Sequence, residues 1–227
     1  MVILGIESSA VSASAALVKD GKLLSEAFLN VGLTHSVTLL PLIRQVVEGA
    51  GLAVSDIDAV AVSNGPGSFT GVRIGVATAK GIAQPEDKKC VPLSTLEVIA
   101  KPLESTGVYA VAVMDARCNQ VYCGIFLVDG EEITRLTEDM ALKIDELEKI
   151  LPDYENVVFV GDGARLCHSK LGYEIAPAGQ LYQRGSSVAF AAEKSFSEEN
   201  TVTAAELMPA YLRLPQAERE LKARLNK

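Results

Sequence analysis

The 227-residue sequence has few histidines, few clustered basic residues and no long apolar run. Its two histidines, His35 and His168, lie far apart, so the metal-hydrolase motifs H-x-x-x-H and H-E-x-x-H are both absent. The only adjacent basic pair is Lys88-Lys89 and the net charge is −8, which argues against autonomous binding to a nucleic-acid backbone. No apolar run approaches the roughly 18 residues of a membrane span, so we expect no membrane association.

The four cysteines also lack the spacing of a metal or redox site, because no two of them form C-x-x-C. We expect incidental thiols in a cytoplasmic protein. The first residues, M-V-I-L-G-I-E, carry no basic region before their apolar run and reach Glu7 at once. They therefore predict a buried strand rather than a signal peptide.

The stretch 64–75, N-G-P-G-S-F-T-G-V-R-I-G, joins an apolar strand pattern at 58–63 to a small-residue helix pattern at 72–83. Such a junction directs backbone N–H groups and a helix dipole to one point. Its spacing excludes a Walker loop and the G-x-G-x-x-G fingerprint, and Pro66 excludes the G-x-S-x-G nucleophile elbow. A structural turn and an anion or partner site remain as alternatives. Ser68 and Thr70 stay candidate nucleophiles that lack a base in their sequence context.

One order of elements occurs twice: two strands, a third strand after an Asp-Gly turn, a helix, a strand, a glycine turn and a helix. The first copy is expected as strands 2–7, 11–18, 23–29 and 58–63 with helices 35–47 and 72–83. The second is expected as strands 108–114, 120–128, 131–136 and 156–160, a helix at 143–151, and a helix after the glycine turn 161–164. This repetition predicts a duplicated α/β unit, with an N-terminal domain at 1–104 and a C-terminal domain at 105–227.

Further elements are expected outside these copies. They are a strand at 90–93, a short helix capped by Ser94 or Thr95, helices at 186–194 and 204–208, an extended piece at 209–213 and a charged tail helix at 216–227. Thr34 is expected to cap the helix at 35–47, which Gly49 and Gly51 should end.

Two carboxylates occupy equivalent places, because Glu7 and Asp115 each end the first strand of their copy. A pseudo-twofold arrangement would bring both to one interdomain cleft, where facing carboxylates suit Mg²⁺ beside nucleotide phosphates. The alternative is that Asp115 merely starts the turn to Arg117 and that Glu7 is half exposed.

Five motifs resemble those of one family. I-L-G-I-E-S-S, T-H-S-V-T-L-L-P-L-I, N-G-P-G-S-F-T-G-V-R-I-G, M-D-A-R-x-x-x-V-Y and P-A-Y-L-R with Ala217-Glu218 occur in the family's order over nearly the whole chain. The chain resembles the TsaB family, subunits of the bacterial machinery that makes threonylcarbamoyladenosine at position 37 of tRNAs reading codons that start with A. The resemblance implies two duplicated ribonuclease-H-like domains, similar to the actin, sugar-kinase and heat-shock ATPase superfamily.

The resemblance also implies partners. The catalytic paralogue, TsaD, carries an H-x-x-x-H metal site that this chain lacks, so we expect a non-catalytic partner of TsaD and of the ATPase TsaE. ATP and Mg²⁺ would be used by the complex, with no cofactor held tightly by this chain, and tRNA would be contacted through the complex. Pairing with TsaD, or homodimerisation, is implied through the helices at 35–47 and 72–83. The interface residues expected there are His35, Ser36, Leu39, Leu40, Ile43, Arg73, Val76, Ala79, Lys80 and Ala83.

The first strand departs from the family pattern. Glu7-Ser8-Ser9 stands where the family usually has Asp-Thr-Ser, and residues 8–14 contain no glycine where the superfamily's phosphate loop usually holds one. A nucleotide or anion site is therefore expected only in vestigial form. Its candidate residues are Glu7, Ser8, Ser9, Gly67, Ser68, Asp115, Gly161 and Gly163.

Two classes of function are compatible with these residues. The first is a non-catalytic scaffold and activator of the TsaD transferase, which the family motifs and the absent histidine pair favour. The second is a stand-alone enzyme. It would be a nucleotide-binding hydrolase, which Glu7 and Asp115 favour, or a glycoprotease-like enzyme, which Ser68 favours.

Overall fold

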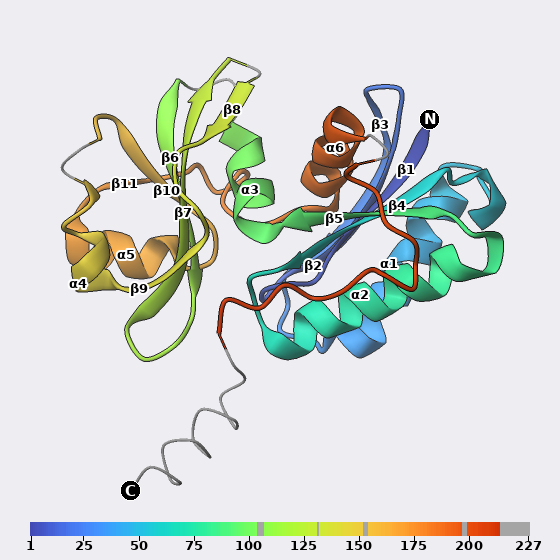
Figure 1. Cartoon of the computed structure of the whole chain (residues 1–227), viewed down its shortest axis with the longest axis horizontal. Coiled ribbons are helices and arrows are strands. Elements are labelled where there is room, and N and C mark those ends of the chain that lie inside the picture. Colours follow the sequence, from blue (N-terminus) through green and yellow to red (C-terminus); the bar gives the residue numbers. More distant parts are fainter. Residues whose placement is uncertain (104–106, 131, 152–153, 197–198, 214–227) are drawn as a thin grey trace, which may run out of the picture.

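The computed structural model describes residues 1–103, 107–130, 132–151, 154–196 and 199–213. Two β-sheets lie side by side, and two helices stand between them (Figure 1). Each sheet has a hydrophobic core of its own, and a third apolar cluster lies where helical residues meet the first sheet.

The first sheet contains five strands from the N-terminal part of the chain. They are β1 (Val2–Glu7), β2 (Ala13–Lys19), β3 (Lys22–Leu29), β4 (Ala59–Gly65) and β5 (Lys89–Ser94). Their order is β3-β2-β1-β4-β5, with an antiparallel meander of β1, β2 and β3 and parallel pairing from β1 through β5. Asp20 and Gly21 both have positive φ, as a tight Asp-Gly hairpin requires.

Two helices, α1 (His35–Gly49) and α2 (Phe69–Ala83), cover one face of this sheet (Figure 1). Their apolar residues recur at helical spacing and join the strands in one core. α1 ends at Gly49, as the sequence predicts, and Gly51 follows in the left-handed region. Short 3-10 turns lie at Val54–Asp56 and Gln84–Glu86.

The second sheet is built from the later part of the chain. Its elements are β6 (Val108–Asp115), β7 (Gln120–Asp129), β8 (Glu132–Arg135), β9 (Met140–Lys143), β10 (Val157–Val160), β11 (Glu174–Ile175), and the helices α4 (Ile144–Leu147) and α5 (Ala164–Leu171). The strand order is β11-β10-β6-β7-β8, and β9 pairs with β7.

The two sheets share one topology. Each has an antiparallel meander, a parallel strand beside the first strand, a glycine turn into a helix, and a further parallel strand at the edge. The predicted duplication and α/β class are therefore confirmed. β9 is an element that the second copy adds and the sequence pattern did not predict.

The two helices between the sheets are exchanged between the copies. α3 (Thr95–Ala100) follows β5, yet Leu96 and Ile99 pack in the core of the second sheet. α6 (Gly185–Ser195) follows the second sheet, yet Val188 packs on the first. Each half of the molecule therefore contributes a helix to the core of the other.

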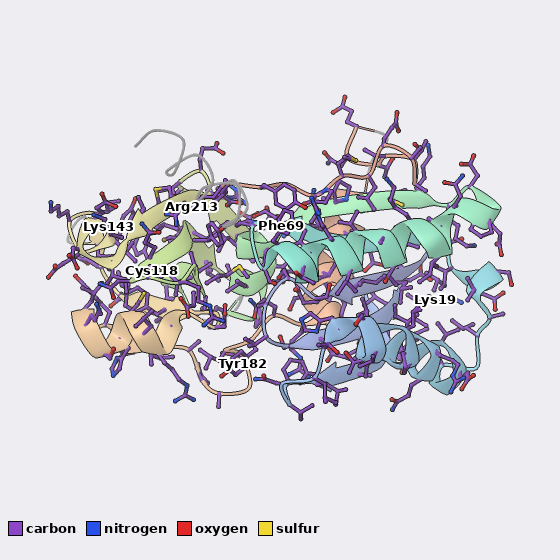
Figure 2. All side chains as sticks on the ribbon, turned by 90° about the horizontal axis from the view of Figure 1, so that it is seen from below. Lys19, Phe69, Cys118, Lys143, Tyr182 and Arg213 are labelled. Carbon is purple, nitrogen blue, oxygen red and sulfur yellow. The ribbon has the colours of Figure 1, made fainter. Side chains whose placement is uncertain are left out.

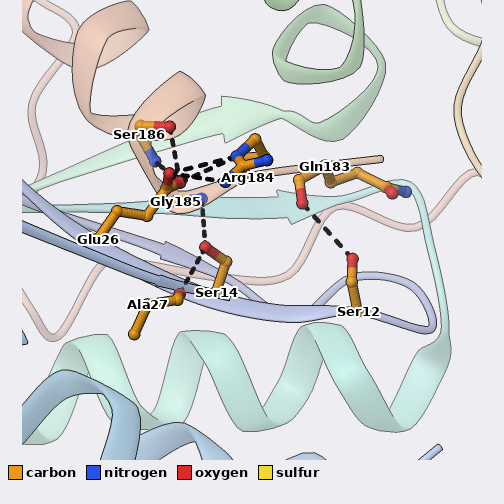
Figure 3. Close-up of polar contacts among 8 residues, drawn as sticks. All are labelled: Ser12, Ser14, Glu26, Ala27, Gln183, Arg184, Gly185 and Ser186. Atoms are coloured by element: carbon orange, nitrogen blue, oxygen red, sulfur yellow. Dashed lines mark hydrogen bonds and ion pairs between the residues drawn. The ribbon is translucent and has the colours of Figure 1, made fainter. Parts of the chain in front are cut away.

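The start of α6 is fixed to the first sheet by Glu26 on β3 (Figure 3). The Glu26 carboxylate accepts hydrogen bonds from Ser186 N at 3.1 Å and Ser186 Oγ at 2.7 Å, and it pairs with Arg184 at 3.0 Å. Gly185 N donates to Ser14 Oγ at 2.9 Å. A carboxylate at a helix N-terminus is also favoured by the helix dipole. Polar contacts thus anchor α6 to the first half.

Several predicted elements differ from the structure. α2 begins at Phe69 rather than at residue 72, because Ser68 Oγ caps it by accepting a hydrogen bond from Gly71 N at 3.3 Å. The helix predicted at 143–151 is reduced to α4. Thr34 and Ser94 precede α1 and α3 but make no side-chain cap.

The helix predicted at 204–208 is wrong, because a single turn is formed there. The predicted tail helix at 216–227 and the pair Ala217-Glu218 lie outside the described residues, as does the predicted domain boundary at 104. That division stays a prediction. The structure adds that α6, Ala204 and Leu207 pack on the first sheet rather than the second.

Candidate functional site

An open cleft of about 360 Å³ lies between the two halves, at the start of α2. The first half lines it with the loop after β1 and with the glycine turn before α2. The second half lines it with the end of β6, the β6–β7 hairpin and the second glycine turn. The polar residues on the cleft are Ser9, Ser68, Thr70, Asp115, Arg117, Tyr122 and Asp162.

Asp115 lies on this cleft, as predicted, and it also starts the turn to Arg117. Its Oδ1 accepts a hydrogen bond from Arg117 N at 2.8 Å, and its Oδ2 is 3.6 Å from the Arg117 guanidinium. Arg117, Cys118 and Asn119 all have positive φ, which is costly for residues with a Cβ. Lys170 donates to the Asn119 side chain and supports this turn. The tight turn brings Arg117 to the cleft.

Asp162 is a second carboxylate on the cleft, between the two glycines of the 161–164 turn. Burial raises the pKa of its carboxyl to about 6, and the nearby Asp115 adds to this shift. Gln183 Nε2, at 3.5 Å, opposes the shift. The sequence reasoning missed Asp162 and Arg117 as cleft residues. The sequence marks these residues by position alone: Asp162 stands between two glycines, and Arg117 follows the end of a strand.

Glu7 does not reach the cleft, which corrects the prediction that it faces Asp115. Its side chain is fully buried, and its Oε1 accepts hydrogen bonds from Ser9 N at 2.6 Å and Ser9 Oγ at 2.5 Å. Among the described residues Oε2 makes no hydrogen bond of normal geometry, although the neighbouring Ser63 hydroxyl partly opposes the effect of burial on the pKa. Burial raises the pKa of the Glu7 carboxyl. The half-exposed alternative is therefore also wrong.

The glycine stretch lets the loop after β1 pack directly on α2. A Cβ added at Gly67 would lie 2.4 Å from Ser9 O, and one added at Gly71 would lie 2.2 Å from Ser8 O. Ser68 N donates to Ser9 O at 2.7 Å, and Ser8 Oγ donates to Gly71 O at 2.9 Å. The amides of Ser9 and Ser68 are thus engaged inside the protein, which favours the structural turn over a phosphate cradle.

Ser68 is exposed at the cleft but lacks the partner of a catalytic nucleophile. Its Oγ is the cap of α2, and His35 Nε2 donates instead to Ala10 O at 2.7 Å. His168 Nδ1 contacts Tyr173 O at 2.7 Å. No hydrogen bond joins Ser68 to either histidine in the part of the chain that the structure describes. The geometry therefore gives no nucleophile–base pair.

The second glycine turn has a similar packing role. A Cβ added at Gly161 would lie 2.2 Å from Val113 O, and Gly163 N donates to Val113 O at 3.1 Å. Of the expected anion-site residues, the cleft brings together Ser9, Gly67, Ser68 and Asp115. Glu7, Ser8, Gly161 and Gly163 are buried beneath it.

The ten expected partner residues lie in three places: the core, the start of α1 and the outer side of α2. Five of them, Leu39, Ile43, Val76, Ala79 and Ala83, are buried in the core between the helices and the first sheet. Their assignment to a partner surface is corrected, because the apolar face of each helix packs on the chain's own strands. The surface of α1 and α2 is formed by other residues.

An exposed apolar patch lies at the start of α1. Leu40 is 58% exposed and Val37 is 62% exposed, and Val31 and Leu33 in the preceding loop are 64% and 59% exposed. These four residues are called the α1 patch below. His35 and Ser36 lie beside it, half-buried and exposed respectively, so three of the expected interface residues are at or next to this surface.

Arg73 and Lys80, the expected interface residues on the outer side of α2, contact the chain's own C-terminal segment. Arg73 Nε donates to Tyr211 Oη, and Lys80 Nζ donates to Ala205 O at 3.2 Å. Figure 2 shows Phe69, at the first turn of α2, and Arg213 near the junction of the two halves.

The comparisons with known proteins agree with one another on the family. The model of a family described as TsaD, tRNA N6-adenosine threonylcarbamoyltransferase, matches residues 30–221. The tRNA threonylcarbamoyladenosine biosynthesis protein TsaB of Bacillus subtilis (strain 168) is 30% identical, covering 96% of this chain and 96% of its own length. This chain belongs to the TsaB family. The TsaB protein of Escherichia coli (strain K12) is likewise 30% identical, covering 94% of this chain and 95% of its own.

The fold comparison agrees with membership in the TsaB family. A crystal structure from Pseudomonas aeruginosa, an uncharacterized protein with similarity to peptidase YeaZ, has a TM-score of 0.81 at 24% identity and covers 93% of this chain and 99% of that one. This chain therefore has the fold of that structure, an α/β fold with two sheets of the same topology.

Three further observations concern membrane helices, metal ligands and the cysteines. Among the described helices, none combines the length and the hydropathy needed to cross a membrane. No group of three or more His, Cys, Asp or Glu side chains suited to a metal gathers in those same ranges. The cysteines are all free, and Cys118 is exposed while the other three are buried.

Proposed function

We propose that this chain is a non-catalytic subunit in the formation of threonylcarbamoyladenosine on tRNA, acting as scaffold and activator of a TsaD-type transferase together with a TsaE-type ATPase. The observation that carries the proposal is the full-length similarity to TsaB proteins in a sequence with only two histidines, far apart, and hence no H-x-x-x-H pair. The capped Ser68, which has no base, supports the same conclusion.

The α1 patch is the proposed contact with the transferase. Four large apolar side chains stand exposed together at one end of a helix, which is typical of a protein–protein contact surface. His35, Ser36 and the exposed Arg44 lie on the same helix and supply polar groups near the apolar patch, as at the edge of many interfaces. In the absence of the transferase, the same patch would pair two copies of this chain.

A charge placed in this patch tests the contact. Leu40→Glu should abolish co-elution with the transferase on a sizing column, because an unpaired carboxylate would be buried at the centre of the interface. Gln45→Glu is the matched control, since it adds the same charge at another exposed position of α1 and should leave co-elution intact. Unchanged co-elution of Leu40→Glu, with the control also unchanged, would remove the patch from the interface.

The remaining parts of the proposal concern the contact with tRNA and the use of ATP. The net charge of −8 supports a tRNA contact made mainly by the transferase rather than by this cytoplasmic subunit. ATP and Mg²⁺ would be consumed by the complex, without a cofactor held tightly here.

A stand-alone nucleotide hydrolase is the second candidate, which the pair Asp115 and Asp162 in the cleft favours. Calorimetry of the purified chain with Mg²⁺ and ATP separates the two candidates. The scaffold proposal expects no binding heat. Tight binding that is lost in Asp115→Ala would favour the hydrolase instead.

A further inference from the structure

Residues 202–213, which we call the strap, contain one turn at 204–206 but no helix, and they leave the first sheet, follow α2 and end near the second half (Figure 1). It begins at an antiparallel bridge between Val202 and Cys90 on β5, with both hydrogen bonds at 2.9 Å. Ala204 and Leu207 are buried in the core under α2. The first part of the strap is therefore packed firmly on the first half.

The middle of the strap is bonded to the end of β4. Asn64 Nδ2 donates to Met208 O at 3.0 Å, and Ala210 N donates to Asn64 O at 2.7 Å. A Cβ added at Gly65 would lie 2.0 Å from Ala210 O, and Gly65 has a φ of +134°. Only glycine permits this close approach of the two backbones. Asn64 and Gly65, which open the glycine stretch, therefore bind the middle of the strap.

An aromatic and cationic stack then joins the strap to the first turn of α2. The Arg73 guanidinium lies 3.7 Å from the centre of the Phe69 ring, and the Phe69 and Tyr211 rings stack at 5.1 Å. Arg73 Nε also donates to Tyr211 Oη at 2.7 Å. Phe69 is at the same time a wall of the cleft.

Arg213 carries the strap across to the second half. Its Nη1 donates to Gln120 Oε1 at 2.5 Å, and its guanidinium lies 5.7 Å from the centre of the Tyr122 ring. Gln120 and Tyr122 belong to β7, and Tyr122 lines the cleft from the second half as Phe69 does from the first. The strap thus contacts a residue on each wall of the cleft.

We propose that the strap is an interdomain latch, in which Tyr211 and Arg213 hold the two halves at a fixed orientation and thereby set the opening of the cleft. α3 and α6 join the halves through buried apolar cores, whereas the latch is made of a polar bond and ring contacts at the surface. Such surface contacts are individually weak, so the latch opens at low cost while both cores stay intact. Movement of one packed half against the other then changes the width of the cleft.

Distances between spin labels on the two halves test the latch. Labels at Gln45→Cys on α1 and Arg165→Cys on α5, in a Cys118→Ser background, should give a narrow distance distribution in the parent. Replacing Tyr211 and Arg213 together by Ala should widen the distribution roughly twofold or shift its centre, because the halves then sample several orientations.

Met208→Ala is the matched control, because its side chain is 63% exposed while the strap bonds to Asn64 through the Met208 carbonyl. It should reproduce the parent distribution. An unchanged distribution in the double variant overturns the latch, and so does an equal widening in Met208→Ala. Circular dichroism verifies folding, and the single variant Arg213→Ala, which removes only the contacts with β7, repeats the test if the double variant unfolds.

Discussion

Glu7 and Asp115 end the first strands of the two halves, yet Glu7 is sealed inside the fold and Asp115 lies on the open cleft. The difference arises in the loop that follows each strand. After Glu7, Ser8 and Ser9 turn back onto α2 and cover the carboxylate. After Asp115, the hairpin through Arg117 projects into solvent and leaves the carboxylate uncovered.

Glycine positions explain why the loops differ. Gly67 and Gly71 let the first loop lie in contact with the backbone of α2, where a Cβ would meet a carbonyl oxygen. In the second half, Gly163 packs against the end of β6 itself, so the hairpin beyond it remains free to border the cleft. One duplicated topology therefore gives a closed side and an open side, which is unsuited to the two facing carboxylates of a symmetric metal–nucleotide site.

The largest expected effect concerns Gly71. Gly71→Ala should destabilise the protein by about 3 kcal/mol or more, because its Cβ would lie 2.2 Å from Ser8 O and the loop would have to move. Gly163→Ala, in the glycine turn of the open half, should cost about 1 kcal/mol, since the atom nearest to the added Cβ is at 3.0 Å. Urea unfolding followed by circular dichroism measures both.

Gly81→Ala is the control for these variants, because nothing lies within 4 Å of a Cβ at this exposed position of α2. It should stabilise the helix by up to about 1 kcal/mol. If Gly71→Ala and Gly163→Ala were equally harmful, the contrast between a closed and an open side would be lost.

A second prediction uses the buried carboxyl. The pKa of Glu7 is raised in the folded state by burial, so its contribution to stability is full below the unfolded value of 4.5 and is lost as the pH rises through the folded pKa. Glu7→Gln should therefore flatten the pH dependence of the unfolding free energy above pH 4.5. Asp115→Asn, at the exposed equivalent position, should change stability by less than about 0.5 kcal/mol. A parallel pH dependence in parent and Glu7→Gln would refute the buried-carboxyl account.

A smaller effect is expected for Asp162. Its folded pKa of about 6 lies above the ordinary value of 3.8, so the parent should lose stability as the pH rises from 3.8 through 6. Asp162→Asn keeps the acceptor for Gln183 and should be more stable than the parent by roughly 1–2 kcal/mol at pH 8, with little difference at pH 3.5. Thermal unfolding at the two pH values decides, and a gain that is the same at both would exclude titration of Asp162 as its source.

Local patterns predicted much of the fold. Alternating and apolar runs, two Asp-Gly turns and two glycine turns were sufficient for the meanders, α1, α5, α6 and the duplication. Leu39 and Val76 were expected at a partner surface, but both are buried against the chain's own sheet, because an apolar helix face does not show by itself what covers it. On α1, Val37 and Leu40 are the apolar residues that are exposed and so available to a partner.

The sequence did not predict the strap or the burial of Glu7, because both depend on contacts between residues far apart in the chain. Thr203 and Glu206 cap each other as at a helix start, which made 204–208 resemble a helix. Pro209 disfavours helical backbone before it, and Ala210 pairs instead with Asn64, far away in the sequence. Nothing near Glu7 in the sequence indicates that α2 supports the loop covering it.

The most direct test of the account is a reconstituted transfer reaction. Threonylcarbamoyl adenylate and unmodified tRNA are incubated with this chain alone, with TsaD and TsaE alone, and with all three, and the modified nucleoside is quantified by mass spectrometry. A non-catalytic subunit predicts product only in the complete mixture. Product from this chain alone would contradict it.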